Sequence, residues 1–196
     1  RTVFTITVFI FFAGFSCGQT NGNKEYIRAY YTKIDKGNDW EKLSRTQQHA
    51  DILVELQSGK IEFWRGTSYL PVWVTPKGSW SFEEVISRKG DGPKERPDMV
   101  NSFSSVRIIS EDENSAVVHW RYLPTFDKGN PKLNVDHRIV VDEYFTINAN
   151  GKVTRTIKQG TVKVDDWISN VGVITQTFDL IENGIKSNRV TAKGFG

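Results

Sequence analysis

One strand-like segment, "AVVHWRYL" at 116–123, carries the residues best suited to chemistry. A period of two places His119 and Arg121 on one face and Trp120 and Tyr122 on the other. An imidazole beside a guanidinium could share a proton next to a bound carboxylate or hydroxyl group. The same alternation is typical of any half-buried strand, with the aromatic face inward and His119 and Arg121 in solvent. The solvated outer face is the favoured interpretation, and the catalytic one stays open.

An enzyme at this strand would be a carbon–oxygen lyase or dehydratase acting on uronate-containing oligosaccharides. Such a reaction needs a cation to neutralise the carboxylate and a base to remove the C5 proton. Arg121 offers the cation, His119 the base, and Tyr122 or Tyr144 a phenol. The catalytic candidates are therefore His119, Arg121 and Tyr144.

The segment "VVDEYFTI" at 140–147 contains a local conflict, because Glu143 falls on the same face as apolar residues. Arg155 is in a comparable position between Val153 and Ile157, across a predicted hairpin. Such conflicts are enriched at functional sites. A structural ion pair between Glu143 and Arg155 would explain both residues without a ligand, and both interpretations stay open.

The stretch "IEFWRGTSYLPVW" at 61–73 concentrates large rings around an Arg-Gly turn. Sugar rings pack on Trp or Tyr while arginine donates hydrogen bonds to hydroxyl groups, so the ligand-binding candidates are Arg65, Tyr69, Trp73 and Trp80. Trp73 and Trp80 are expected to be exposed. The alternative is that two or three of these rings fill the core.

The elements that must position these residues follow a period of two from residue 51 onward, and no amphipathic helix of useful length appears. Three or four hairpins are predicted, the third with a strong Asn150-Gly151 turn signal. Pro71 is expected to keep the residues after it from pairing as a central strand. The expected hairpins are "DILVEL" with "KIEFWR", "VRIIS" with "AVVHWRYL", "VVDEYFTI" with "KVTRTIKQ", and a last pair within "VGVITQTFDLI" and the residues after Asn183-Gly184.

The N-terminal segment has the features of an export signal. The apolar run at 3–15 has the length of a signal-peptide core and is too short to span a bilayer. The chain starts at Arg1, so the signal is expected to be truncated. Cys17, the single cysteine, is either the anchor of a lipoprotein or a residue removed with the signal. The protein is therefore expected to be exported, to the periplasm, the medium or the outer membrane as a lipoprotein, with membrane contact only through Cys17.

Composition excludes several classes of function. The chain of 196 residues has 12% aromatic residues and a net charge of +3, from 26 cations and 23 anions that are well mixed along it. Without a basic block, nucleic-acid binding is not expected. No phosphate-binding glycine loop or metal motif occurs, so neither a cofactor nor a metal is expected.

Three segments together resemble a known class of protein: "FWRGTSYLPVW", "VRII…AVVHWRYLP" and "VDEYFTINANGKVTRTIK". They are similar to the N-terminal β-sandwich region, of the galactose-mutarotase-like or supersandwich type, of large secreted bacterial proteins from polysaccharide-degradation loci of the ulvan type. The resemblance implies a carbohydrate-associated role within a longer polysaccharide-degrading protein. It implies no catalytic residue.

These observations predict an all-β protein, an antiparallel, supersandwich-like β-sandwich built of hairpins. Residues 1–18 are assigned to the signal peptide, 19–24 to a linker and 25–196 to the sandwich, whose C-terminal boundary is left open. The leading hypothesis is an exported segment that contacts a polysaccharide or oligosaccharide. The alternatives are the lyase or dehydratase described above and a purely structural module.

Overall fold

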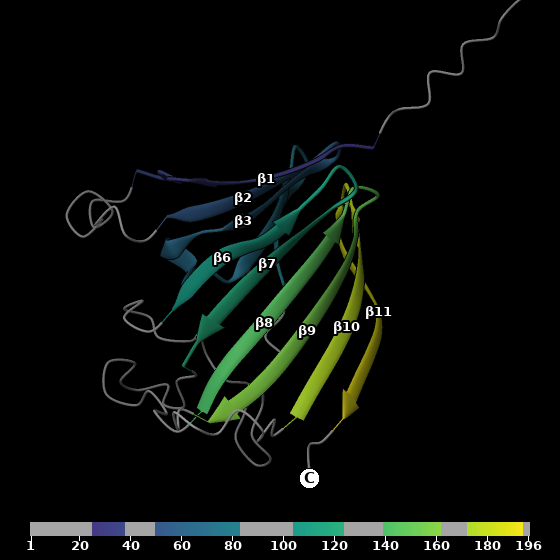
Figure 1. The fold of residues 1–196 in the computed structure, drawn as a ribbon. Helices are drawn as coiled ribbons and strands as arrows, with labels where there is room; N and C mark the ends of the chain where they lie inside the picture. Colours follow the sequence, from purple (N-terminus) through teal and green to yellow (C-terminus); the bar gives the residue numbers. More distant parts are fainter. Residues whose placement is uncertain (1–24, 38–49, 83–103, 124–138, 162–171, 194–196) are drawn as a thin grey trace, which may run out of the picture.

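The computed structural model describes residues 25–37, 50–82, 104–123, 139–161 and 172–193, most of them in β-strands. They form two antiparallel sheets, as the sequence predicted (Figure 1). The five-stranded sheet contains β1 (Ile27–Thr32), β2 (Asp51–Leu56), β3 (Gly59–Phe63), β4 (Pro71–Thr75) and β5 (Gly78–Ser81). The six-stranded sheet contains β6 (Ser105–Glu111), β7 (Ser115–Tyr122), β8 (Ile139–Asn148), β9 (Lys152–Thr161), β10 (Gly172–Ile181) and β11 (Gly184–Lys193).

Strands that are consecutive in the chain are neighbours in each sheet, so each sheet is a simple meander. All four predicted hairpins are present, as β2–β3, β6–β7, β8–β9 and β10–β11. In the β8–β9 turn Gly151 has a φ of 79°, a conformation that glycine adopts without the steric cost of a side chain. The backbone N–H of Gly151 donates to the carbonyl of Asn148 at 2.9 Å, which closes this turn.

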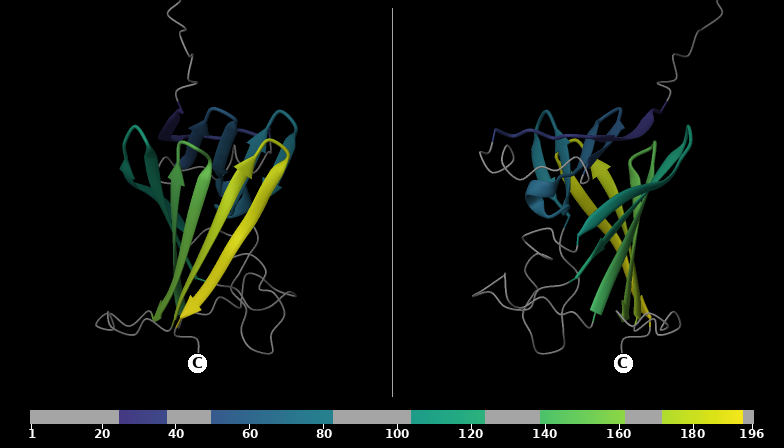
Figure 2. Two further views of the ribbon diagram at one scale, coloured as in Figure 1. Left: turned by 90° about the vertical axis from the view of Figure 1, so that its right-hand side faces the viewer. Right: turned by 60° about the vertical axis from the view of Figure 1, so that its left-hand side comes forward.

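The two sheets pack face to face with their strands crossing, and the long strands β8 to β10 extend past the five-stranded sheet (Figures 1 and 2). Four phenylalanines join the layers in edge-to-face contacts. Phe145 on β8 lies 5.4 Å from Phe63 and 5.6 Å from Phe82, and Phe82 lies 5.2 Å from Phe178, between ring centroids. Rings in this geometry add to the free energy gained from burying their apolar area.

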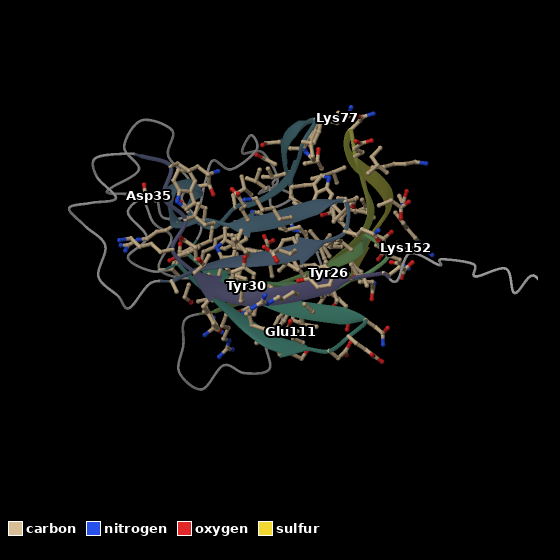
Figure 3. All side chains as sticks on the ribbon, turned by 90° about the horizontal axis from the view of Figure 1, so that it is seen from above. Tyr26, Tyr30, Asp35, Lys77, Glu111 and Lys152 are labelled. Atoms are coloured by element: carbon tan, nitrogen blue, oxygen red, sulfur yellow. The ribbon has the colours of Figure 1, made fainter. Side chains whose placement is uncertain are left out.

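Hydrogen bonds also join the two sheets. Trp73 Nε1, on β4, donates to the carbonyl of Ile181 at the end of β10 at 2.9 Å. Between the edge strands β1 and β6, Glu111 accepts from the backbone N–H of Ala29 at 2.9 Å, and Figure 3 shows Glu111 beside β1. The N–H of Ile108 donates to the hydroxyl of Tyr31 at 2.9 Å. The contacts of Ala29 and Ile108 use backbone N–H groups that open edge strands would otherwise expose.

One expectation about the strands is wrong. Pro71 does not keep the following residues out of a central strand, because β4 pairs with both β3 and β5. Pro71 is the first residue of β4, where the missing N–H and the fixed φ are tolerated. The signal peptide, the linker and Cys17 lie outside the described residues.

Candidate functional site

The Arg65-Gly66 turn of the aromatic-rich stretch lies between β3 and β4 of the five-stranded sheet. A short 3-10 helix, η1 (Arg65–Thr67), follows β3. The ring of Trp64 packs directly over Gly66, where an added Cβ would lie only 2.3 Å from a ring atom. Lys36 Nζ lies 4.7 Å from the centroid of the Trp64 ring. The glycine is therefore needed to accommodate the tryptophan.

Hydrogen bonds fix this turn from both sides. The buried carboxylate of Asp51 accepts from the backbone N–H of Arg65 at 2.8 Å and of Ile34 at 2.7 Å. Ser68 and Tyr69 both have left-handed φ values, 54° and 64°, which are strained for residues with a side chain. Such strain persists only where the surrounding structure holds it in place, and here the N–H of Tyr69 donates to the carbonyl of Trp64 at 2.9 Å.

Burial corrects part of the predicted ligand site. Tyr69 is 1% exposed and Trp73 is 0% exposed, so the expectation that Trp73 is exposed is wrong. Both rings belong to the hydrophobic core, so neither offers a surface on which a sugar could stack. Trp80 is half-buried and packs against the core beside Gly184. Arg65 is half-buried at the start of η1, which connects β3 to β4 of the five-stranded sheet, whereas His119 and Arg121 lie on β7 of the six-stranded sheet.

The structure brings Glu143 and Arg155 together on the inner face of the six-stranded sheet. Arg155 donates from Nε to one carboxylate oxygen of Glu143 at 2.7 Å and from Nη2 to the other at 2.9 Å. The hydroxyl of Tyr122 donates to the same carboxylate at 2.7 Å. Glu143 is 0% exposed and Arg155 is 1% exposed. This bidentate pair and its phenol partner form a closed network inside the sandwich.

The catalytic candidates His119, Arg121 and Tyr144 lie on the outer face of the same sheet. His119 is buried, and both of its ring nitrogens have partners. Arg107 Nε donates to Nδ1 at 2.9 Å, so Nδ1 carries a lone pair and the proton belongs on Nε2. Nε2 then donates to Asp142 at 2.5 Å. Both ring nitrogens of His119 are therefore engaged by the protein, with none left to take a proton from a substrate.

Asp142 is the centre of this cluster. Arg121 donates to its two oxygens, from Nε at 2.8 Å and from Nη2 at 3.0 Å. Burial raises the pKa of Asp142, but the hydrogen bonds from His119 and Arg121 outweigh it and lower the pKa to about 2. The Arg121 side chain is 54% exposed, and its Nη1 is not used by Asp142. Arg121 is thus oriented by the protein, and among the residues that the structure describes the two N–H groups of Nη1 remain available to a ligand.

Tyr144 is a neighbour of this cluster on the same face. Its ring stacks on the ring of His119, with centroids 4.6 Å apart and an angle of 16° between the planes. Lys158 Nζ lies 5.1 Å from the centroid of Tyr144. His119 and Lys158 thus both contact the Tyr144 ring, and the site presents cationic groups and polar edges rather than an open aromatic surface.

The strand register shows what else shares this outer face. Residues directly opposite each other on neighbouring strands project from the same face of a sheet. Cations outnumber carboxylates on this face, among the residues that the structure describes. The cations are Arg107, Arg121, Lys152, Lys158, Lys186 and Arg189, and the carboxylates are Asp142 and Asp179.

The sequence interpretation missed Arg107, Asp142 and Lys158 as members of this cluster. Asp142 and Lys158 are cross-strand partners in the predicted β8–β9 hairpin, so the sequence contained that part of the signal. The pairing of Asp142 with Arg121 joins β8 to β7, two strands of different predicted hairpins, and was not predicted. Arg107 precedes an irregularity in the pairing of β6 with β7, between Ile108 and Ser110. A register shift of this kind is not readable from alternation alone.

Comparisons with known protein families, with curated proteins and with solved structures find no match. Within the described ranges no group of His, Cys, Asp and Glu side chains is arranged to hold a metal ion. No helix in this part of the chain is long and apolar enough to cross a membrane. The candidate site therefore depends on its own geometry, namely a cation-rich sheet face centred on Arg121 and Lys158.

Proposed function

We propose that this chain binds an acidic saccharide through the outer face of its six-stranded sheet, as a segment of an exported protein that degrades polysaccharides. The observation that carries the proposal is the surplus of cations on that face. The chain as a whole has a net charge of only +3, so a single face with such a surplus is a strong local concentration of charge. A face of one sign attracts partners of the opposite sign.

The outer face of the five-stranded sheet lacks such a surplus among its described residues. There Glu62 forms ion pairs with Lys36 at 2.7 Å and with Lys60 at 3.1 Å. Glu55 accepts a hydrogen bond from the hydroxyl of Tyr30 at 2.7 Å. Charges on this face largely satisfy one another, which suits a solvated surface without a charged ligand.

The chemistry of the proposed contacts follows from Arg121 and Lys158. Asp142 already fixes Nε and Nη2 of the Arg121 guanidinium group. The side chain therefore loses little further conformational entropy when Nη1 binds an anion. The ammonium of Lys158, beside Tyr144, is the second cation of the site after Arg121. An ammonium group binds carboxylate and sulfate groups alike. Uronates and sulfated sugars share this anionic chemistry, so both belong to the proposed ligand class.

The lyase or dehydratase alternative gains no support from the geometry of His119. A base must have a nitrogen free for the C5 proton, whereas Nδ1 faces Arg107 and Nε2 faces Asp142. The blander alternative of a structural module agrees with the burial of Trp73. A purely structural module would bind no saccharide, so the absence of binding in the titration would favour it.

The test is calorimetric titration of the full chain with polygalacturonate, dextran sulfate, neutral dextran and a single-stranded DNA oligomer. We expect binding of the first two, with Arg121→Glu plus Lys158→Glu lowering affinity by about tenfold or more. The matched control, Arg28→Glu plus Lys60→Glu, reverses two cations of the other sheet and should leave affinity within about twofold. The proposal fails if neither polyanion binds, if DNA binds as tightly as they do, or if both double variants lose affinity equally.

A further inference from the structure

We propose that the saccharide on this face is an extended chain with acid groups along it, running obliquely across the strands from Arg121 and Lys158 to Arg189 on β11. The inference rests on the proposed function and specifies how the face would be used. It comes from a regular array of hydroxyl groups between the two cationic ends.

Six threonines on four neighbouring strands form this array, which we call the threonine grid. Cross-strand pairs join Tyr144 to Thr156, Thr156 to Thr175 and Thr175 to Thr191 in one row. A parallel row joins Thr146 to Thr154 and Thr154 to Thr177. The members of the threonine grid are Thr146, Thr154, Thr156, Thr175, Thr177 and Thr191.

The hydroxyl groups of the threonine grid are largely unused by the protein. Threonine favours strands, so its presence on one or two of them would need no further explanation. Among the described residues, however, the one hydrogen bond made by a hydroxyl of the grid is long, from Thr191 Oγ1 to the carbonyl of Thr175 at 3.5 Å. Each of the other hydroxyls keeps a donor and acceptor capacity that sugar hydroxyls match.

Cations stand at both ends of the threonine grid. Lys158 follows Thr156 on β9 by two positions, and Arg121 is in the same cross-strand row as Lys158, through Asp142. At the opposite corner, Arg189 on β11 is the partner of Thr177. A chain that follows this diagonal would meet cations first, then hydroxyls, then a cation again.

The spacing sets a minimum length for the bound chain. Lys158 and Arg189 are two strand intervals and four residues apart, which amounts to about 17 Å for strands about 4.8 Å apart with a rise of about 3.4 Å per residue. A disaccharide does not bridge this distance, whereas a longer oligosaccharide does. Contacts at both ends of one chain would raise the effective concentration of the second contact.

The experiment measures affinity against chain length, with di-, tetra- and hexagalacturonate titrated into the full chain. We expect the hexamer to bind about tenfold more tightly than the dimer. Thr154→Val plus Thr156→Val plus Thr175→Val keeps branched side chains in the strands but removes three hydroxyls, and should lower hexamer affinity by about three- to tenfold. Arg189→Gln, at an exposed edge position, should reduce the gain in affinity from dimer to hexamer. This reduction should occur whether or not the three threonines are replaced. Thr32→Val, in the other sheet, is the control and should change nothing.

The outcomes separate this inference from the proposed function. Affinity that does not depend on length, or that is unchanged in both the threonine variant and Arg189→Gln, overturns the oblique path while the cation-rich face still stands through Arg121 and Lys158. Failure of all three oligomers and of polygalacturonate to bind overturns the proposed function as well.

Discussion

Two arginine–carboxylate pairs lie on opposite faces of the same sheet, and their carboxylates are consecutive in the chain. Glu143 points inward to Arg155, and Asp142 points outward to Arg121. The inner pair is 0% and 1% exposed, whereas the Arg121 side chain is 54% exposed. Both pairs are bidentate, so geometry alone does not distinguish them.

The difference in solvent exposure assigns the two pairs different roles. Inside the sandwich, removing one partner would leave the other as an uncompensated charge out of water, so stability depends on Glu143 and Arg155 staying paired. On the outer face, solvent screens the attraction, and the Asp142–Arg121 pair can add little to stability. What the outer pair can do is fix the direction of a guanidinium group that a ligand can reach. The comparison indicates a structural role for the inner pair and puts the outer pair at the centre of the proposed binding face.

The largest expected effect comes from breaking the inner pair. Arg155→Met should lower the free energy of unfolding by about 3 to 5 kcal/mol, because Glu143 is left buried without its cation. Glu143→Leu combined with Arg155→Met should recover most of that loss. Urea denaturation followed by fluorescence measures both. A loss below about 1 kcal/mol for the single variant would contradict a structural role.

The corresponding change on the outer face should have a much smaller effect on stability. Arg121→Gln should change the free energy of unfolding by less than about 1 kcal/mol, because its head group is mostly in solvent. The same variant should weaken binding of polygalacturonate by about threefold or more. If Arg121→Gln unfolds the protein as readily as Arg155→Met, the proposed division between the two pairs is wrong.

Acid should reveal the contribution of Asp142. Its pKa is about 2 in the folded chain against an ordinary value of 3.8, so the unfolded chain binds its proton first as pH falls. The stabilisation is therefore complete above about pH 4 and is lost as pH falls from about 4 towards 2. Asp142→Asn should remove about 1 kcal/mol of this pH dependence, a value reduced for partial exposure. Thermal unfolding measured between pH 5 and pH 2 tests this, and identical slopes for both proteins would refute it.

The smallest expected effect concerns Arg107, which fixes the tautomer of His119. Arg107→Gln should change stability by only about 0.5 kcal/mol, since a single partly exposed hydrogen bond is lost. In the unaltered chain, nitrogen NMR shifts of the imidazole should show the proton on Nε2 of His119. A proton on Nδ1 would contradict the arrangement in which His119 donates to Asp142.

The sequence predicted much of the sheet and less of the site. Alternation correctly turned Trp120 and Tyr122 inward, and the turn signal at Asn150-Gly151 located the β8–β9 hairpin. Alternation could not reveal that Trp73 is buried, because its indole meets the carbonyl of Ile181, which is 108 positions away in the chain. Contacts of this kind depend on how the two sheets dock. A single sequence carries little local signal for them.

The distribution of charge was hidden for the same reason. Cations and anions are well mixed along the chain, so no basic segment marked a binding face. Register then places Arg107, Arg121 and Lys158 on one side of one sheet. The net charge of each segment of the sequence therefore hides the surplus of cations, which appears only when neighbouring strands are aligned in the sheet.

The most direct test of the binding face is NMR of the full chain with labelled threonine methyl groups, titrated with hexagalacturonate. The threonine grid provides probes on the outer face, and Thr32, Thr67 and Thr75 provide controls in the other sheet and its turn. We expect shift changes at Thr154, Thr156 and Thr175 and none at the controls. Shifts at the controls without shifts in the grid, or no shifts at all at saturating ligand, would contradict saccharide binding by the cation-rich face.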